Sequence, residues 1–158
     1  MHLYIQQRVF AWTDTYDIYD ETGEARYEVR SDFLSLGHQI HVYDKRTGRE
    51  VGSIREKMMV LRPKFQIIID GQLMGSVRKE FTFLLPKYEV DYLGWVVEGN
   101  ILGCRYQVFD GSREVMSIAR ELFSLGDAYG LEYANPEDEI PGVLLVLAID
   151  AANCTHNK

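Results

Sequence analysis

The segment EIPGVLLVLAIDAA, residues 139–152, is the only long apolar run in the 158-residue chain. The preceding NPED, residues 135–138, supplies a candidate cap and acidic side chains, which favour a helix N-terminus because it carries partial positive charge. On a helix, residues 143–152 would be apolar on every side except at Asp150. A helix without a polar side is normally buried. The sequence therefore predicts a central helix at residues 139–152.

The length of this segment distinguishes a membrane span from a protein core. A membrane span needs about 20 apolar residues, so the run is too short for transmembrane insertion. As a helix it would be about 21 Å long at ~1.5 Å per residue. A six-residue strand spans roughly 20 Å. A helix of this height therefore fits inside a closed sheet of such strands.

Residues 3–133 consist of short β-type segments separated by turn signals. Asp70-Gly71 between two apolar runs is the clearest hairpin signal, because both central residues of a type I′ turn need positive φ. Gly99-Asn100 is a second signal of this kind. The spacing of about ten residues favours an antiparallel meander, sandwich or barrel. We predict about twelve strands, at residues 3–10, 16–19, 25–30, 39–43, 51–56, 65–69, 73–79, 88–92, 95–98, 103–109, 115–120 and 128–133.

The strands and the apolar segment together predict the fold class. A barrel of about eight strands is filled by its own side chains, whereas a wider barrel needs another filling. One apolar helix would fill the interior that a barrel of twelve strands leaves open. We therefore expect residues 1–158 to form a single mostly β (α+β) domain. Its architecture would be a closed antiparallel barrel of about twelve strands around a central hydrophobic C-terminal helix.

A weak internal echo connects the two halves of the chain. Val42-Tyr43-Asp44 and the residues after it resemble Val108-Phe109-Asp110 and its successors, with Ile18-Tyr19-Asp20 as a vaguer third copy. Two interpretations stay open. Antiparallel hairpins resemble one another in general, or the chain contains an ancestral duplication.

Charge is distributed unevenly along the chain. Against 17 Lys and Arg stand 24 Asp and Glu, a net charge of −7, which argues against nucleic-acid binding. Residues 44–88 nevertheless hold ten basic and five acidic residues. If the basic side chains gather at one rim, they form an anion-binding patch suited to a lipid head group or a phosphate ligand. The alternative is a solvated face balanced by neighbouring acids. The candidate patch consists of Arg55, Lys57, Arg62, Lys64, Arg78 and Lys79.

No residue pattern predicts catalysis, a metal site or a cofactor. The sequence contains neither a Gly-x-Ser-x-Gly motif nor a glycine-rich phosphate-binding loop. His38 and His41 would point to opposite faces of a strand, which disfavours a shared zinc site. We expect Asp150 near the helix end at the barrel mouth, paired with an arginine, rather than as a buried acid with a raised pKa.

The cellular location is predicted from the cysteines and the N-terminus. Two cysteines, Cys104 and Cys154, do not make a disulfide framework, and no secretory leader opens the chain. We therefore expect a cytoplasmic protein with reduced thiols.

The strand pattern, DAYGLEY at residues 127–133 and LLVLAIDA at 144–151 resemble the LURP-one-related family. This family belongs to the superfamily of the Tubby C-terminal domain and the phospholipid scramblases. The resemblance implies a twelve-stranded barrel around a C-terminal helix and no established enzymatic chemistry. Tubby proteins bind phosphoinositide head groups through a basic patch, and scramblases act at membranes. In scramblases a calcium-like loop precedes the helix; here Asp127, Glu132, Glu137 and Asp138 occupy that region without its dense alternation of acids, so calcium binding stays open.

Three functions follow in order of preference. The first is a non-enzymatic binding or scaffold module, recognising a phospholipid head group or phosphorylated ligand through the basic residues. The second is a protein–protein interaction module in stress or defence-like signalling, with tyrosine-rich strands supplying contacts. The third is an enzyme without a visible catalytic motif.

Overall fold

The computed structural model describes residues 1–6, 15–34, 37–57, 62–80, 87–123 and 126–154. The predicted extension of the first strand over residues 7–10 lies outside these residues. Among the described residues there are twelve strands, one 3₁₀ turn and one α-helix. Their bounds are β1 His2–Gln6, β2 Thr15–Asp20, β3 Ala25–Leu34, β4 Gly37–Asp44, β5 Glu50–Lys57, β6 Lys64–Ile69, β7 Gln72–Glu80, β8 Lys87–Tyr92, β9 Val96–Asn100, β10 Arg105–Asp110, β11 Arg113–Phe123, β12 Gly126–Tyr133, η1 Pro136–Asp138 and α1 Glu139–Cys154.

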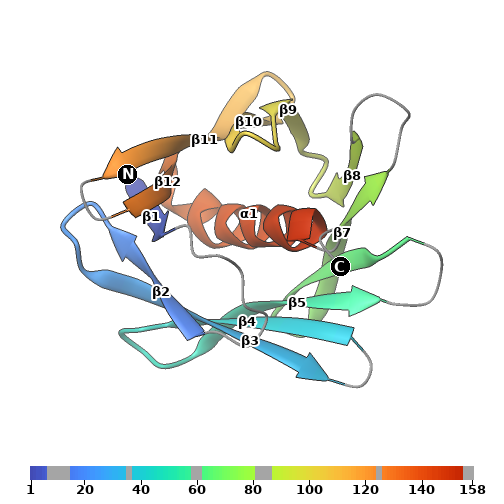
Figure 1. Cartoon of the computed structure of the whole chain (residues 1–158), viewed down its shortest axis with the longest axis horizontal. Helices are drawn as coiled ribbons and strands as arrows, with labels where there is room; N and C mark the ends of the chain where they lie inside the picture. Colours follow the sequence, from blue (N-terminus) through green and yellow to red (C-terminus); the bar gives the residue numbers. More distant parts are fainter. Residues whose placement is uncertain (7–14, 35–36, 58–61, 81–86, 124–125, 155–158) are drawn as a thin grey trace.

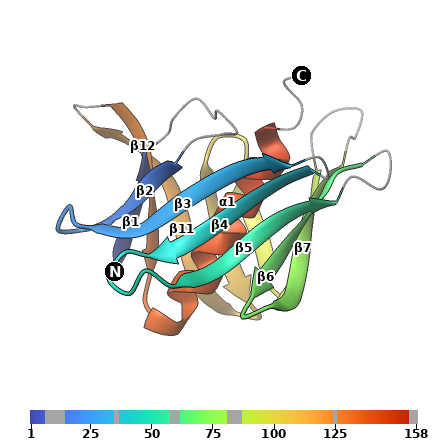
Figure 2. The ribbon, with the colours of Figure 1, turned by 90° about the horizontal axis from the view of Figure 1, so that it is seen from below.

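All twelve strands belong to one antiparallel sheet that curls around α1 (Figures 1 and 2). Its order is β8-β7-β6-β5-β4-β3-β2-β1-β12-β11-β10-β9, so the pairing of β1 with β12 joins the two ends of the chain. The strands at the two sheet edges, β8 and β9, have no ladder to each other in the described part of the chain. The predicted fold class is confirmed, with a wall that is nearly closed.

The central helix supplies the interior of the barrel. It begins at the predicted residue, Glu139, and continues two residues beyond the predicted end, to Cys154. Residues 143–149 and Ala151–Ala152 are at most 1% exposed, because the surrounding strands turn their alternate apolar side chains toward them. Within the described residues, no helix is both long and apolar enough to span a membrane.

The helix approaches the wall most closely at two glycines. A Cβ atom at Gly52 of β5 would lie 2.4 Å from Cδ1 of Leu144, and one at Gly142 would lie 2.1 Å from Cε of Met116. At each of these glycines, the neighbouring side chain occupies the space that a Cβ atom would need. The wall and the helix are therefore fitted to each other at the level of single atoms.

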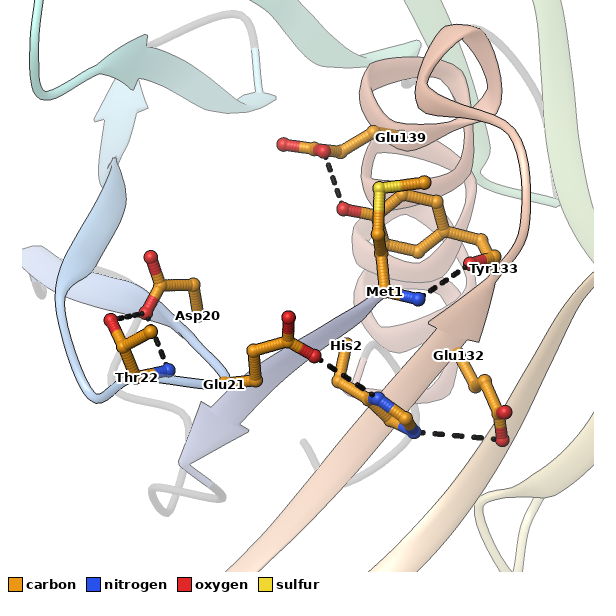
Figure 3. A network of polar contacts seen from close by, with 8 residues as sticks. All are labelled: Met1, His2, Asp20, Glu21, Thr22, Glu132, Tyr133 and Glu139. Carbon is orange, nitrogen blue, oxygen red and sulfur yellow. Dashed lines mark hydrogen bonds and ion pairs between the residues drawn. The ribbon is translucent and has the colours of Figure 1, made fainter.

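The N-terminal end of α1 is held by hydrogen bonds from the wall. The buried Glu139 carboxylate accepts hydrogen bonds from the phenols of Tyr27 and Tyr133, and its Oε1 lies 3.3 Å from Nε of Arg26. Burial, with the adjacent carboxylate, raises the pKa of both phenols, so both remain donors. The amino group of Met1 donates to the Tyr133 carbonyl at 3.0 Å, which ties the first residue to the same site (Figure 3).

The hairpin predictions are confirmed at one turn and wrong at another. Asp70 and Gly71 form the turn between β6 and β7 with φ of 51° and 74°, as a type I′ turn requires. Gly99 and Asn100 instead belong to β9, and the turn follows at residues 101–104. The Asn100 side chain closes that turn by accepting a hydrogen bond from the Gly103 N–H at 2.9 Å.

A register shift occurs shortly before the turn in four hairpins. It falls between Ile18 and Tyr19, Val42 and Tyr43, Ile67 and Ile68, and Val108 and Phe109. Three of these positions are those of the sequence echo. The fourth hairpin has the same shift without the echo, which favours a common hairpin geometry over duplication.

Replacement of Leu144 by alanine tests the role of the helix as the core. Leu144 is 0% exposed, so we expect Leu144→Ala to lower the free energy of unfolding by about 2–5 kcal/mol in urea titrations. Leu73 is 60% exposed, and the control Leu73→Ala should change it by less than about 0.5 kcal/mol. Similar losses for the two variants would contradict a buried helix.

Candidate anion-binding face and the polar end of the helix

Strand register places three of the predicted basic residues in one row. Lys57 of β5 lies opposite Lys64 of β6, and Lys64 lies opposite Arg78 of β7. Their sequence neighbours Phe65 and Val77 are buried in the core, so the three cations lie on the outer surface of the wall. Arg55 occupies the same side of β5 two residues earlier and is exposed. We call the set Arg55, Lys57, Lys64 and Arg78 the basic face.

The charges of the basic face are not neutralised by described neighbours. No carboxylate of the described residues lies within 4.0 Å of a charged nitrogen of these four side chains. Glu89 is opposite Arg78 on β8, yet the two make no ion pair. The Nε–H of Arg78 is buried and has no hydrogen-bond partner among the described residues. The structure therefore disfavours the interpretation of a face balanced by neighbouring acids.

The two other predicted basic residues lie apart from this face. Nη1 of Arg62 is 3.5 Å from Oε1 of Glu80, so an acid offsets its charge. Lys79 follows the outward Arg78 and therefore faces the inner side of the wall, with Nζ 5.9 Å from the ring centroid of Tyr88. Of the six candidate residues, Lys79 thus lies on the opposite side of the wall from Arg78, because side chains alternate along a strand.

Like charges placed opposite each other across a sheet destabilise it by roughly 0.2–1 kcal/mol. We therefore expect Lys64→Glu, which lies between two cations, to raise the free energy of unfolding by about 0.5–1 kcal/mol in urea titrations. The gain should shrink in high salt, which screens exposed charges. Lys87 lies opposite Glu80, so the control Lys87→Glu should lower stability instead. A lower stability of Lys64→Glu would refute the arrangement.

The C-terminal part of α1 carries the other candidate group, Asp150. It is partly buried, and its Oδ2 accepts a hydrogen bond from the Tyr129 phenol. Desolvation raises the pKa of Asp150 to about 7. The partial negative charge at a helix C-terminus acts in the same direction. The predicted pairing of Asp150 with an arginine is wrong, because Asp150 makes no ion pair with the described residues. The pKa of Asp150 is raised instead.

Three neighbouring groups share this environment. The Tyr88 phenol donates to Oδ1 of Asn153, and burial together with the Asp150 charge raises its pKa to about 12. Burial raises the pKa of Tyr106 well above 10, and its hydroxyl has no hydrogen-bond partner among the described residues. Burial also raises the pKa of the Cys104 thiol. A thiol with a raised pKa is a poor nucleophile, so Cys104 is not an activated thiol.

The raised pKa of Asp150 predicts a pH-dependent stability. Its folded-state pKa of about 7 exceeds the ordinary value of 3.8, so its stability contribution is complete below about pH 4 and is lost as the pH rises through 7. Asp150→Asn keeps an acceptor for Tyr129 but removes the charge. We expect this variant to be more stable than the parent above pH 7, on the order of 2 kcal/mol, with the gain fading toward about pH 4 in urea titrations.

Asp91, on the outer surface of β8, is exposed and provides the control. Asp91→Asn should show no comparable dependence of the stability difference on pH. A gain for Asp150→Asn that is constant between about pH 4 and pH 8 would refute the raised pKa.

A buried polar pair lies on the inner side of β4 and β5 and was not predicted. Nδ1 of His38 is 2.5 Å from Oε2 of Glu56, which also accepts a hydrogen bond from the His38 backbone N–H at 3.0 Å. The only signal was that Glu56 falls at an apolar position of the alternation. His41 contacts Glu50 on the outer side, so the prediction that the two histidines face opposite ways is confirmed.

The four acids considered for calcium are not brought together. Asp138 is buried, with its Oδ2 2.6 Å from Nη1 of Arg113. Glu132 lies on β12 beside His2, which is placed between Glu132 and Glu21 (Figure 3). Asp127 is near the opposite end of β12, and Glu137 is exposed in η1. No group of three or more metal-binding side chains gathers anywhere in the described ranges.

Comparison with known proteins identifies the family. The sequence model of the LURP-one-related family matches residues 1–150, almost the whole chain. The chain belongs to the LURP-one-related family. The family comparison names no enzymatic activity.

Two known proteins are similar to this LURP-one-related chain over most of its length. The chain is 31% identical over 150 residues to the uncharacterized protein YxjI of Bacillus subtilis (strain 168), covering 95% of this chain and 92% of YxjI. It is also similar to an X-ray structure of a protein from Arabidopsis thaliana, with a TM-score of 0.63 and 17% identity over 96% of this chain and 90% of that one. The second likeness concerns the fold alone.

Proposed function

We propose that this LURP-one-related protein is a non-enzymatic binding module of one domain, residues 1–158. Its basic face recognises a phosphate-bearing ligand. The observation that carries the proposal is the row formed by Lys57, Lys64 and Arg78, none of which makes an ion pair within 4.0 Å with a described residue. Such a row lowers the stability of the sheet, and binding of an anion would offset the repulsion.

The spacing of the row suits a ligand with more than one phosphate group. Neighbouring strands are about 4.8 Å apart, so the three cations extend over roughly 10 Å along the surface. One phosphate can contact two neighbouring side chains, and a second phosphate can reach the third. Arg78 brings a guanidinium with several N–H donors, one of which has no partner among the described residues.

The net charge of the chain limits which surfaces can carry such a ligand. A net charge of −7 repels a broadly anionic membrane surface. The basic face attracts over short distances, because salt screens exposed charges beyond about 8–10 Å. The proposal therefore concerns one small ligand that carries several phosphate groups, either free in the cytoplasm or as the head group of a sparse phospholipid, and no nucleic acid.

The test compares two triple charge reversals. Lys57→Glu, Lys64→Glu and Arg78→Glu remove the row, and Arg46→Glu, Arg49→Glu and Arg105→Glu change the net charge equally at exposed positions elsewhere. Titration calorimetry with inositol hexakisphosphate should show binding to the parent that weakens at least about tenfold in the first variant and is retained in the second. Circular dichroism verifies that both variants are folded.

Vesicle flotation distinguishes the two sources of the phosphate. Vesicles of phosphatidylcholine with a few per cent of phosphatidylinositol bisphosphate bind the parent if a head group is the ligand, whereas binding in calorimetry alone indicates a free phosphate compound. The proposal fails if neither probe binds at low salt. It fails equally if the two triple variants lose binding to the same degree.

A further inference from the structure

A second surface of interest is the seam between the two edge strands of the sheet. β8 and β9 follow each other in sequence, with the turn at residues 93–95 between them, yet each pairs only with its other neighbour, β7 or β10. One side of each strand therefore has main-chain N–H and C=O groups without a strand partner in the described structure. Such an edge is a ready template for pairing with another extended chain.

Several exposed apolar side chains lie on or next to the strands that border this seam. Of six large apolar residues exposed in the described structure, four lie on β9, on β7 or in the turns that flank β9. Val96 of β9 is 53% exposed, and Leu93 and Leu102, in the turns before and after β9, are 39% and 55% exposed. Leu73, on β7 near the β8–β9 turn, is 60% exposed. Clustered exposed apolar side chains indicate an interaction surface more strongly than scattered ones do.

The charge of the seam is negative. Glu89 and Asp91 of β8 and Glu98 of β9 are exposed, and none makes an ion pair with a described residue. Lys87, at the start of β8, is the one exposed base on these two strands, so three acids outnumber it. β9 contains no lysine, arginine or proline, the residues that commonly protect an edge strand from pairing. The acidic seam, defined as these three acids with Val96 and Leu102, is thus apolar and anionic.

Charge favours a basic partner over a second copy of this chain. An antiparallel pair of two β9 strands centred on the middle residue would place Glu98 opposite Glu98, which is unfavourable. An extended segment of alternating basic and apolar residues would place its cations near the three acids on the outer face, and its apolar side chains would turn to the inner face, beside Val97. We propose that β9 binds such a segment of a partner protein as an added strand.

The probe is a labelled peptide of about seven alternating lysine and valine residues, blocked at both ends, whose binding is measured by fluorescence anisotropy. An alternating glutamate and valine peptide tests the charge. A lysine and valine peptide with methylated backbone nitrogens tests the added strand, because it keeps the charge but lacks donors. We expect the first peptide to bind and both others to bind at least about tenfold more weakly.

Glu98→Lys should weaken binding of the alternating lysine and valine peptide at least about tenfold, whereas Glu24→Lys, an equal charge change at an exposed position of the β2–β3 turn, should not. Hydrogen exchange should show new protection of residues 96–100 when the peptide binds. Equal binding of the methylated peptide, an unaffected Glu98→Lys variant, or dimerisation through β9 would each overturn the proposal. The double reversal Lys57→Glu and Lys64→Glu, which leaves Arg78 opposite Glu89 in place, should weaken phosphate binding and leave peptide binding intact, so this test is independent of the proposed phosphate binding.

Discussion

The barrel and the helix cannot bury their apolar surfaces without each other. Side chains on all sides of α1 are 0–1% exposed, and each large one represents about 1.5–3 kcal/mol of transfer free energy, as an upper estimate. Twelve strands in a ring would leave an interior too wide for their own side chains. Because the helix supplies the core, the wall does not require a hydrogen bond between every pair of neighbouring strands. The seam between β8 and β9 is therefore compatible with a stable fold.

The acidic side chains at the two ends of α1 have different polar surroundings. At the N-terminal end, buried acids receive donors: Glu139 from two phenols, and Asp138 from Arg113. These acids also lie where the helix dipole favours negative charge. At the other end Asp150 has the phenol of Tyr129 and the unfavourable end of the same dipole. Phenols of the wall thus bind both ends of the helix, and the last turns also carry the group with the raised pKa.

The sequence could predict the strands and the helix, because both depend on local apolar periodicity, but it could not predict the register. The shift between Ile67 and Ile68 shows why. Counted from the Asp70-Gly71 turn without that shift, Lys64 would lie opposite Val77. With it, Lys64 lies opposite Arg78, and the basic row forms. A change of one residue moves every later side chain to another partner, and no single residue type announces it.

Two other differences between expectation and structure have local causes. Arg78 and Lys79 are adjacent in sequence and therefore face opposite sides of the wall, which alternation along a strand predicts without knowledge of the register. Gly99-Asn100 has the composition of a tight turn, but Gly99 pairs with Tyr106 and the turn follows later.

Strand register also separates the charges of the molecule in space. Cations collect on the outer side of β5, β6 and β7, while β8 and β9 present Glu89, Asp91 and Glu98. A partner with a basic extended segment is attracted to the seam and repelled by the basic face, and an anionic ligand has the opposite preference. The two surfaces adjoin where Arg78 lies opposite Glu89. The net charge of −7 conceals this division, which only the pairing of the strands reveals.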